Sequence, residues 1–137
     1  MSIEFKENPL LVTIQDVFRR NAPGWILKNA IYSDETRVYS EWQSQNDEVV
    51  VQVAMMSSLE AAETNLRLFD SRVSSKGNAS LPDLGDENHV WHKSDELRST
   101  VIKFRTGHAV VQISGSDLEV SVSLARALAE SLRSTPE

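Results

Sequence analysis

The stretch that decides the fold is VVQV at residues 50–53 followed by SSLE at residues 57–60, because the chain repeats it as VVQI at residues 110–113 followed by SDLE at residues 116–119. Each copy joins an apolar, β-branched run, which favours a strand, to a Ser-x-x-Glu capping box, which favours a helix start. In each box the first serine, Ser57 or Ser116, is expected to accept a hydrogen bond from the first helical turn. The pattern predicts two copies of one strand-to-helix unit.

Hydrophobic periodicity and turn residues predict the remaining elements. A helix with Pro9 at its first position is expected to follow the cap Asn8 and to end near Arg20. After it, apolar alternation predicts three strands, and the first capping box opens a helix that closes near Gly77. The predicted strands cover residues 25–32, 37–43, 48–56, 88–92, 99–105 and 109–114, and the last helix covers residues 118–133.

This order of elements predicts an α+β fold in a single domain, residues 1–137. Antiparallel neighbours joined by short turns, with a helix after each set, are typical of a two-layer sandwich in which helices cover one face of a mostly antiparallel sheet. Two strand-strand-helix repeats, about residues 30–76 and 88–134, follow the N-terminal helix. The inward helical stripes are expected to be Leu59, Ala62, Leu66, Phe69 and Val73 in the first repeat and Leu118, Val122, Ala125, Leu128 and Leu132 in the second, with Leu124 nearer the margin.

Composition excludes several classes of function. Fourteen basic residues against 20 acidic ones give a net charge of −6, which opposes a nucleic-acid phosphate backbone. No apolar stretch approaches the roughly 18 residues of a membrane span. The absence of cysteine excludes disulfides, thiolate nucleophiles and zinc ribbons. The N-terminus has no charged region followed by an apolar one, so the compartment stays open between the cytoplasm and an exported protein whose signal has been removed.

The motifs of common enzymes are missing from the chain. There is no Gly-x-Ser-x-Gly elbow and no glycine-rich phosphate loop, so no nucleotide or other cofactor is expected. One cluster, Asp86, Glu87, His89 and His92, offers donors for a metal or for acid–base chemistry. His89 and His92 are three positions apart, and such residues face opposite sides of a strand, so no metal site is predicted. A small hydrolase or isomerase that uses this cluster is the alternative function.

Aromatic side chains are the better candidates for a ligand site or an interface. Trp42 and Trp91 belong to predicted strands, and Tyr39 lies on the opposite side of its strand from Trp42. If the helices cover one face of the sheet, one of these two sides must face solvent or a partner. The alternative is that both tryptophans fill the core. The candidate ligand or interface residues are therefore Tyr39, Trp42, Trp91 and His89.

The second half of the chain resembles a group of uncharacterised small bacterial α/β domains. The resemblance covers about residues 81–132 and is carried by LGDE at 84–87, IKFRTGHAVV at 102–111 and LARALA at 124–129. The Thr-Gly-His turn at 106–108 departs from that group, in which an asparagine-containing turn is expected. Many of those domains are exported or lipid-anchored, and no catalytic residues accompany the pattern. The resemblance implies a hairpin-plus-helix fold and a bacterial source.

Together these observations favour a non-catalytic binding or accessory module over an enzyme. Its partner is expected to be a protein or a small ligand, with no nucleic acid and no membrane span. Sheet edges and an uncovered sheet face also favour a homodimer, since a twofold contact is the commonest way for a small protein to cover such surfaces.

Overall fold

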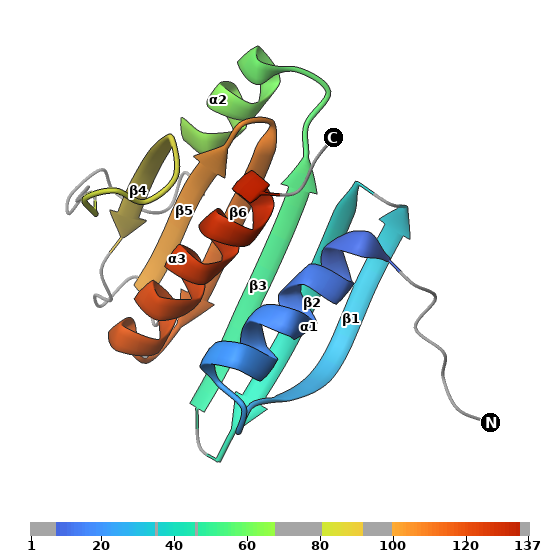
Figure 1. The fold of residues 1–137 in the computed structure, drawn as a ribbon, viewed down its shortest axis with the longest axis vertical. Coiled ribbons are helices and arrows are strands. Elements are labelled where there is room, and N and C mark those ends of the chain that lie inside the picture. Colours follow the sequence, from blue (N-terminus) through green and yellow to red (C-terminus); the bar gives the residue numbers. More distant parts are fainter. Residues whose placement is uncertain (1–7, 35, 46, 68–80, 92–99, 135–137) are drawn as a thin grey trace.

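One antiparallel sheet of six strands, in the order β1-β2-β3-β6-β5-β4, organises the molecule (Figure 1). The computed structural model describes residues 8–34, 36–45, 47–67, 81–91 and 100–134. Its elements are α1 (Pro9–Asn21), β1 (Ile26–Asp34), β2 (Arg37–Ser44), β3 (Asp47–Met55), α2 (Leu59–Arg67), β4 (Glu87–Trp91), β5 (Thr100–Thr106), β6 (Ala109–Gly115) and α3 (Leu118–Ser134). The predicted α+β class, antiparallel sheet and N-terminal helix are confirmed.

The first helix begins where the cap residue predicts. Asn8 has an extended backbone, and its Oδ1 accepts hydrogen bonds from the backbone N–H of Leu10 at 2.9 Å and of Leu11 at 3.2 Å. Pro9 has no N–H to satisfy, so it suits the first helical position. The helix ends at Asn21, one residue beyond the predicted end. The side-chain Nδ2 of Asn21 donates to Val17 O.

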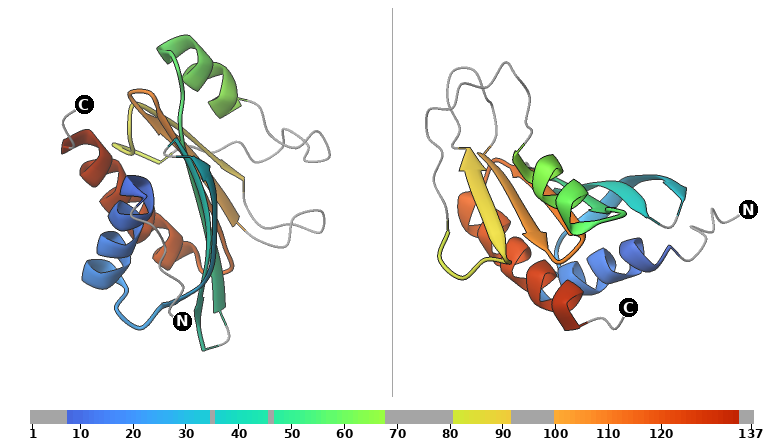
Figure 2. Two further views of the ribbon diagram at one scale, coloured as in Figure 1. Left: turned by 90° about the vertical axis from the view of Figure 1, so that its right-hand side faces the viewer. Right: turned by 90° about the horizontal axis from the view of Figure 1, so that it is seen from above.

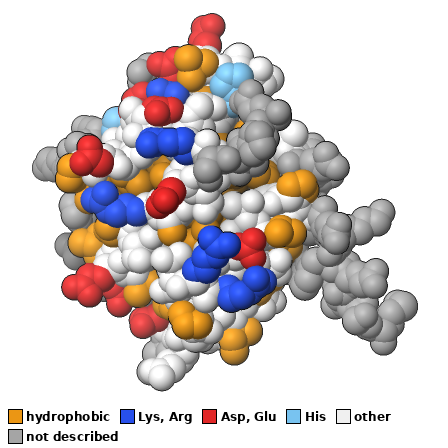
Figure 3. Space-filling view, in the orientation of Figure 1, with side chains coloured by type: hydrophobic (Ala, Val, Ile, Leu, Met, Phe, Trp, Pro, Cys, Tyr) orange, Lys and Arg blue, Asp and Glu red, His pale blue; other side chains and the backbone are white. Residues whose placement is uncertain are grey.

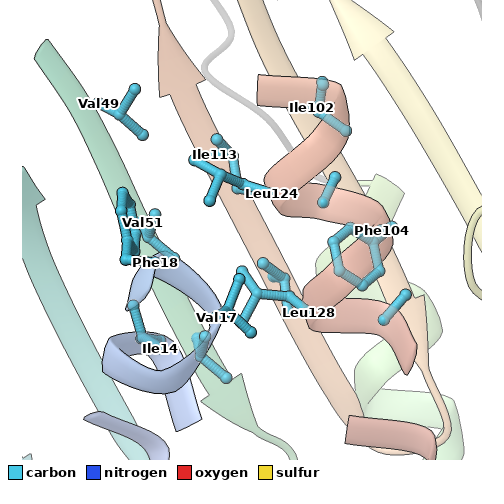
Figure 4. Packing of buried hydrophobic residues seen from close by; sticks show 14 of the residues in the cluster. Ile14, Val17, Phe18, Val49, Val51, Ile102, Phe104, Ile113, Leu124 and Leu128 are labelled. Atoms are coloured by element: carbon cyan, nitrogen blue, oxygen red, sulfur yellow. The ribbon is translucent and has the colours of Figure 1, made fainter. Parts of the chain in front are cut away.

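The main core lies between the sheet and the pair α1 and α3, which pack side by side on one face (Figures 1 and 2). We call this the helix face. The strands contribute alternate residues to it, because register pairing places Val51 of β3 beside Ile113 of β6. Phe18 of α1 and Leu124 and Leu128 of α3 point into the same layer (Figure 4). The other residues of the sheet form the second face, which we call the open face.

The helix α2 lies on the open face, not beside α3 (Figure 2). It contacts one end of β4, β5 and β6, and Lys103 of β5 donates from Nζ to Asn65 O of α2 at 2.6 Å. Lys103 points away from its neighbours Ile102 and Phe104, which are in the core. The prediction that both helices cover the same face is therefore wrong for α2, although α1 and α3 do share one face.

The residue at the end of the strand differs between the two central strands. At the end of β6, Gly115 lets α3 fold back closely onto the helix face, since a Cβ there would lie 2.7 Å from Ser121 Oγ. The position 60 residues earlier is Met55, whose side chain packs against the core. After Met55 the chain continues past the end of the sheet, where Met56 N donates to His108 O in the β5–β6 turn, and α2 then begins on the other side.

Two details of the predicted helix starts are also corrected. The caps are Ser58, whose Oγ accepts from Ala61 N at 3.0 Å, and Asp117, whose Oδ1 accepts from Val120 N at 3.2 Å. Both lie one residue later than the predicted caps Ser57 and Ser116, because the helices begin at the leucines that follow. Ser116 Oγ instead donates to Asp47 Oδ1 at 3.2 Å.

The inward stripes differ from the prediction at the first residue of each helix and at Leu124. Leu59 is 46% exposed and Leu118 is 41% exposed, whereas Leu124 is only 1% exposed. The predicted inward positions of Leu59 and Leu118 and the marginal position of Leu124 are thus wrong, while Leu66, Ala125 and Leu128 are buried as predicted. Phe69, Val73 and the predicted helix end near Gly77 lie outside the described residues.

Candidate functional site

A hollow of about 420 Å³ lies on the open face, beside α2 and across the middle of the sheet. It lies within the usual volume range of small-molecule sites. Five strands and α2 contribute to its lining, so it depends on most of the sheet rather than on one loop. The lining residues are Ile31, Arg37, Val38, Tyr39, Gln52, Val53, Ala54, Asn65, Lys103, Val110 and Gln112.

A row of mostly polar side chains crosses this face at the level of the hollow. The strand register aligns Tyr39 with Gln52, Gln52 with Gln112, and Gln112 with Lys103. Side chains paired in this way across antiparallel strands have Cβ atoms about 4.5–5.5 Å apart. The row continues to His89 on the edge strand β4. Two side-chain amides therefore lie at the centre of the sheet, between a phenol and an ammonium group.

Lys103 is the most buried charged residue of the described part of the chain. It is 6% exposed, and its Nζ donates to Asn65 O in the last turn of α2. Burial lowers the pKa of Lys103 below its usual value of 10.5, because the protonated form loses water. Both Lys103 and Asn65 line the hollow, so this contact joins α2 to the edge of the candidate site.

Tyr39 is tied to its own strand on the other side of the two glutamines. Its Oη donates to Glu41 Oε2 at 3.0 Å. Burial raises the pKa of Tyr39 above 10.0, and the hydrogen bond to Glu41 and the negative charges of Glu41 and Glu48 raise it further. Tyr39 therefore stays a neutral phenol at physiological pH and supplies a polar group to the hollow.

Basic and acidic side chains occupy different positions on the open face. Arg37 and Lys103 lie at or near the end covered by α2, and Arg105 lies in the next row on β5. The acidic residues Glu41 and Glu48 lie toward the opposite end, near the β2–β3 turn, whereas Glu87 on the edge strand β4 is the cross-strand neighbour of Arg105. Among the described residues that line the hollow, two are basic and none is acidic. The hollow is thus locally positive, although the chain as a whole carries a net charge of −6.

The four candidate residues from the sequence are divided between the two faces. Trp42 is in the core on the helix face, where its ring stacks on Phe18 with centroids 3.8 Å apart and planes inclined by 7°. Its Nε1 donates to Ser40 Oγ at 3.0 Å. Tyr39, His89 and Trp91 belong to the open face, as their odd positions on β2 and β4 require. Of the four, Tyr39 alone lines the hollow.

The described side chains of the alternative catalytic cluster make separate contacts and do not form one site. Asp86 Oδ2 accepts from Gly107 N at 2.7 Å and lies 3.5 Å from Arg105 Nη1, so this carboxylate holds the β5–β6 turn. Glu87 Oε2 lies 3.4 Å from His89 Nε2 on the open face of β4. His92 lies outside the described residues. Within the described ranges, no group of three or more histidine or carboxylate side chains is placed to hold a metal ion.

A second hollow, of about 440 Å³, lies between α1 and α3 on the outer side of the helices. Its charged lining residues, Asp16, Arg20 and Glu130, carry both signs. The surface around these helices likewise mixes acidic and basic side chains (Figure 3). The open-face hollow differs from it in having charge of one sign and a central pair of amides.

Compared with protein-family models, curated proteins and solved structures, the chain matches none of them. None of the helices in the described ranges combines the length and apolar composition needed to cross a membrane. The geometry of the open face is thus the basis for a functional proposal.

Sequence reasoning missed the residues at the centre of this site, Gln52, Gln112, Arg37 and Lys103. The repeat placed both glutamines at equivalent positions, but it did not show that β3 and β6 are neighbours that pair them directly. A stronger signal was a lysine within the apolar strand run TVIKF at residues 100–104. A charge on a largely buried strand indicates a partner or a site.

Proposed function

We propose that this protein is a non-catalytic binding module that receives a small ligand in the open-face hollow. The observation that carries the proposal is the hollow itself, about 420 Å³ in volume and lined by five strands and α2. Apolar groups such as Ala54 and Val110 share its surface with the amides of Gln52 and Gln112. Such a mixture, with a few polar groups on a mostly preformed surface, is typical of ligand sites.

The interactions of the titratable groups support binding rather than catalysis. The Lys103 ammonium donates to a backbone carbonyl, and the Tyr39 hydroxyl donates to Glu41, so both are held in structural hydrogen bonds. The Glu87–His89 pair lies on the edge strand, outside the lining of the hollow. A general acid and base must both reach the reacting atoms, and the described lining holds no carboxylate or imidazole for that purpose.

The test is a fragment screen followed by backbone amide NMR of the full chain. Fragments that are neutral, anionic or cationic are titrated separately, and those that bind are expected to shift the amides of Gln52, Val110 and Gln112. Ala54→Leu fills the open-face hollow and should abolish these shifts. Ala127→Leu is the matched control, because Ala127 lines the hollow between α1 and α3.

Two results would overturn the proposal. One is that no fragment of any charge shifts the open-face amides at millimolar concentration. The other is that bound fragments are displaced by Ala127→Leu and retained by Ala54→Leu, which would place the binding site between the helices.

A further inference from the structure

The charge of the hollow specifies its ligand more closely, and this step rests on the proposed binding function. We propose that the open-face hollow binds a small organic carboxylate, whose charged group lies beside Lys103 and Gln112 and whose apolar body lies over Ala54 and Val110. Protein carboxylates are ionised well below pH 7, and a simple organic acid is likewise an anion under those conditions.

The first reason is the sign of the local charge. The basic lining residues Arg37 and Lys103 approach from β2 and β5, on either side of the two central strands. Three acidic residues of the face lie outside the lining: Glu41 and Glu48 toward the far end of the strands, and Glu87 on the edge strand β4, where it lies 3.4 Å from His89. The net charge of −6 repels anions at long range, but physiological salt screens exposed charges beyond about 8 Å. At contact distance the hollow favours an anion.

The second reason is the supply of oriented donors. Gln112 is the direct cross-strand neighbour of Lys103, so an amide N–H and an ammonium group can approach one carboxylate from adjacent strands. Gln52 lies directly opposite Gln112 and extends the row of amides. Hydrogen bonds from an ammonium to a carboxylate are stronger than those between neutral groups.

The third reason is the hydration that the Lys103 ammonium loses on burial. A buried ammonium loses hydration, and its hydrogen bond to Asn65 O restores part of that loss. A carboxylate in the hollow would interact with this ammonium in surroundings of lower polarity than water, where charge pairs attract more strongly. The apolar neighbours Ala54 and Val110 would meanwhile bury hydrocarbon. A carboxylate with an apolar body gains both the attraction to the ammonium and the burial of hydrocarbon, whereas inorganic phosphate gains only the attraction.

Three probes with the same eight-carbon chain test this proposal: octanoate, octan-1-ol and octylammonium, each titrated into the full chain at pH 7 and followed by backbone amide NMR. Octanoate is expected to bind at the open-face amides at least tenfold more tightly than octanol, and octylammonium is expected to bind least. Lys103→Met keeps an unbranched side chain, shorter by the terminal nitrogen, and removes its charge, so it should weaken octanoate binding at least tenfold while leaving octanol binding unchanged.

The matched control is Arg133→Met, which removes one positive charge from the last turn of α3 and should leave octanoate binding unchanged. If Lys103→Met fails to give a folded spectrum, Gln112→Leu and Arg37→Met replace it, and each should weaken octanoate at least threefold. Equal binding of octanoate and octanol, or octanoate binding that the open-face variants leave intact, would overturn the choice of an anion. Those results would not contradict the proposal of a binding module. That proposal fails only if no fragment binds in the open-face hollow.

Discussion

Leu128→Ala tests the packing of α3 most directly. Leu128 is 0% exposed and lies in the layer shared by α1, α3 and the sheet (Figure 4). The substitution removes three carbon groups at about 0.8 kcal/mol each, or about 2.4 kcal/mol of transfer free energy. Its neighbours Val17 and Phe104 are almost wholly buried, so the site is expected to keep a cavity of about 60 Å³, which costs about 1.5 kcal/mol more. The expected loss in the free energy of unfolding is about 4 kcal/mol.

The matched control is Leu118→Ala in the first turn of the same helix. Leu118 is 41% exposed and opens to solvent, so its truncation leaves no closed cavity and should cost about 1 kcal/mol. Urea unfolding of the two variants, followed by circular dichroism, gives both free energies of unfolding. It also shows whether the dependence of that free energy on urea concentration has the same slope in the two variants. Leu124→Ala should match Leu128→Ala. Equal losses for Leu118 and Leu128, or a mild Leu124→Ala, would refute the observed phase of α3.

Three further measurements address the core polar contacts, the buried lysine and the turns. Ser40→Ala should cost about 1–3 kcal/mol in urea unfolding, because it leaves Trp42 Nε1 buried without its acceptor, and Trp42→Phe in the same background should recover part of the loss. The pKa of Lys103 is lower in the folded than in the unfolded chain, so the unfolded chain binds more protons between the two values and the free energy of unfolding should rise with pH toward 10.5. Lys103→Met should lack this part of the rise, and parallel curves for the two proteins would contradict the assignment. Gly85→Ala should lower the free energy of unfolding by more than about 2 kcal/mol and Gly107→Ala by about 1 kcal/mol, so the melting temperature should fall further for Gly85→Ala. Both glycines have positive φ, but a Cβ at Gly85 would lie 2.5 Å from Arg105 O. Similar melting temperatures would show that the contact at Gly85 relaxes at no cost.

The strands could be predicted from the sequence because their signal is local. Alternation from Arg37 onward and the apolar run after Asp47 mark β2 and β3 to within a residue or two. The same alternation correctly placed Tyr39 and Trp42 on opposite faces. The helix starts were displaced by one residue, since Ser57 and Ser58 are adjacent and both can cap a helix. Leu59 and Leu118 were misassigned because each is the first residue of its helix and remains partly exposed there, whereas Leu66 and Leu128 further along the same helices are buried.

The face on which α2 lies could not be predicted, because it depends on contacts between distant parts of the chain. Gly115 admits the close approach of α3, and Met55, 60 residues earlier, packs against the core, but both contacts appear only once the sheet is assembled. The candidate site was hidden for the same reason. Gln52 and Lys103 come from strands far apart in the sequence, and the order of strands in the sheet makes them part of one surface. Asp86 and His89 are close in the sequence and were therefore candidates for one catalytic cluster, but their side chains have separate contacts.

The packing of α1 on α3 has a consequence for the synthesis of this protein on the ribosome. The two helices are separated in the chain by all six strands, and the central seam between β3 and β6 joins the two halves of the sheet. Ribosomes add about 5–20 residues per second, so the apolar side of α1, with Leu11, Ile14 and Phe18, lacks its final cover for several seconds. During that interval the nascent chain presents a natural binding surface for a chaperone. Truncation before α3 would make that exposure permanent, and such fragments should aggregate rather than fold.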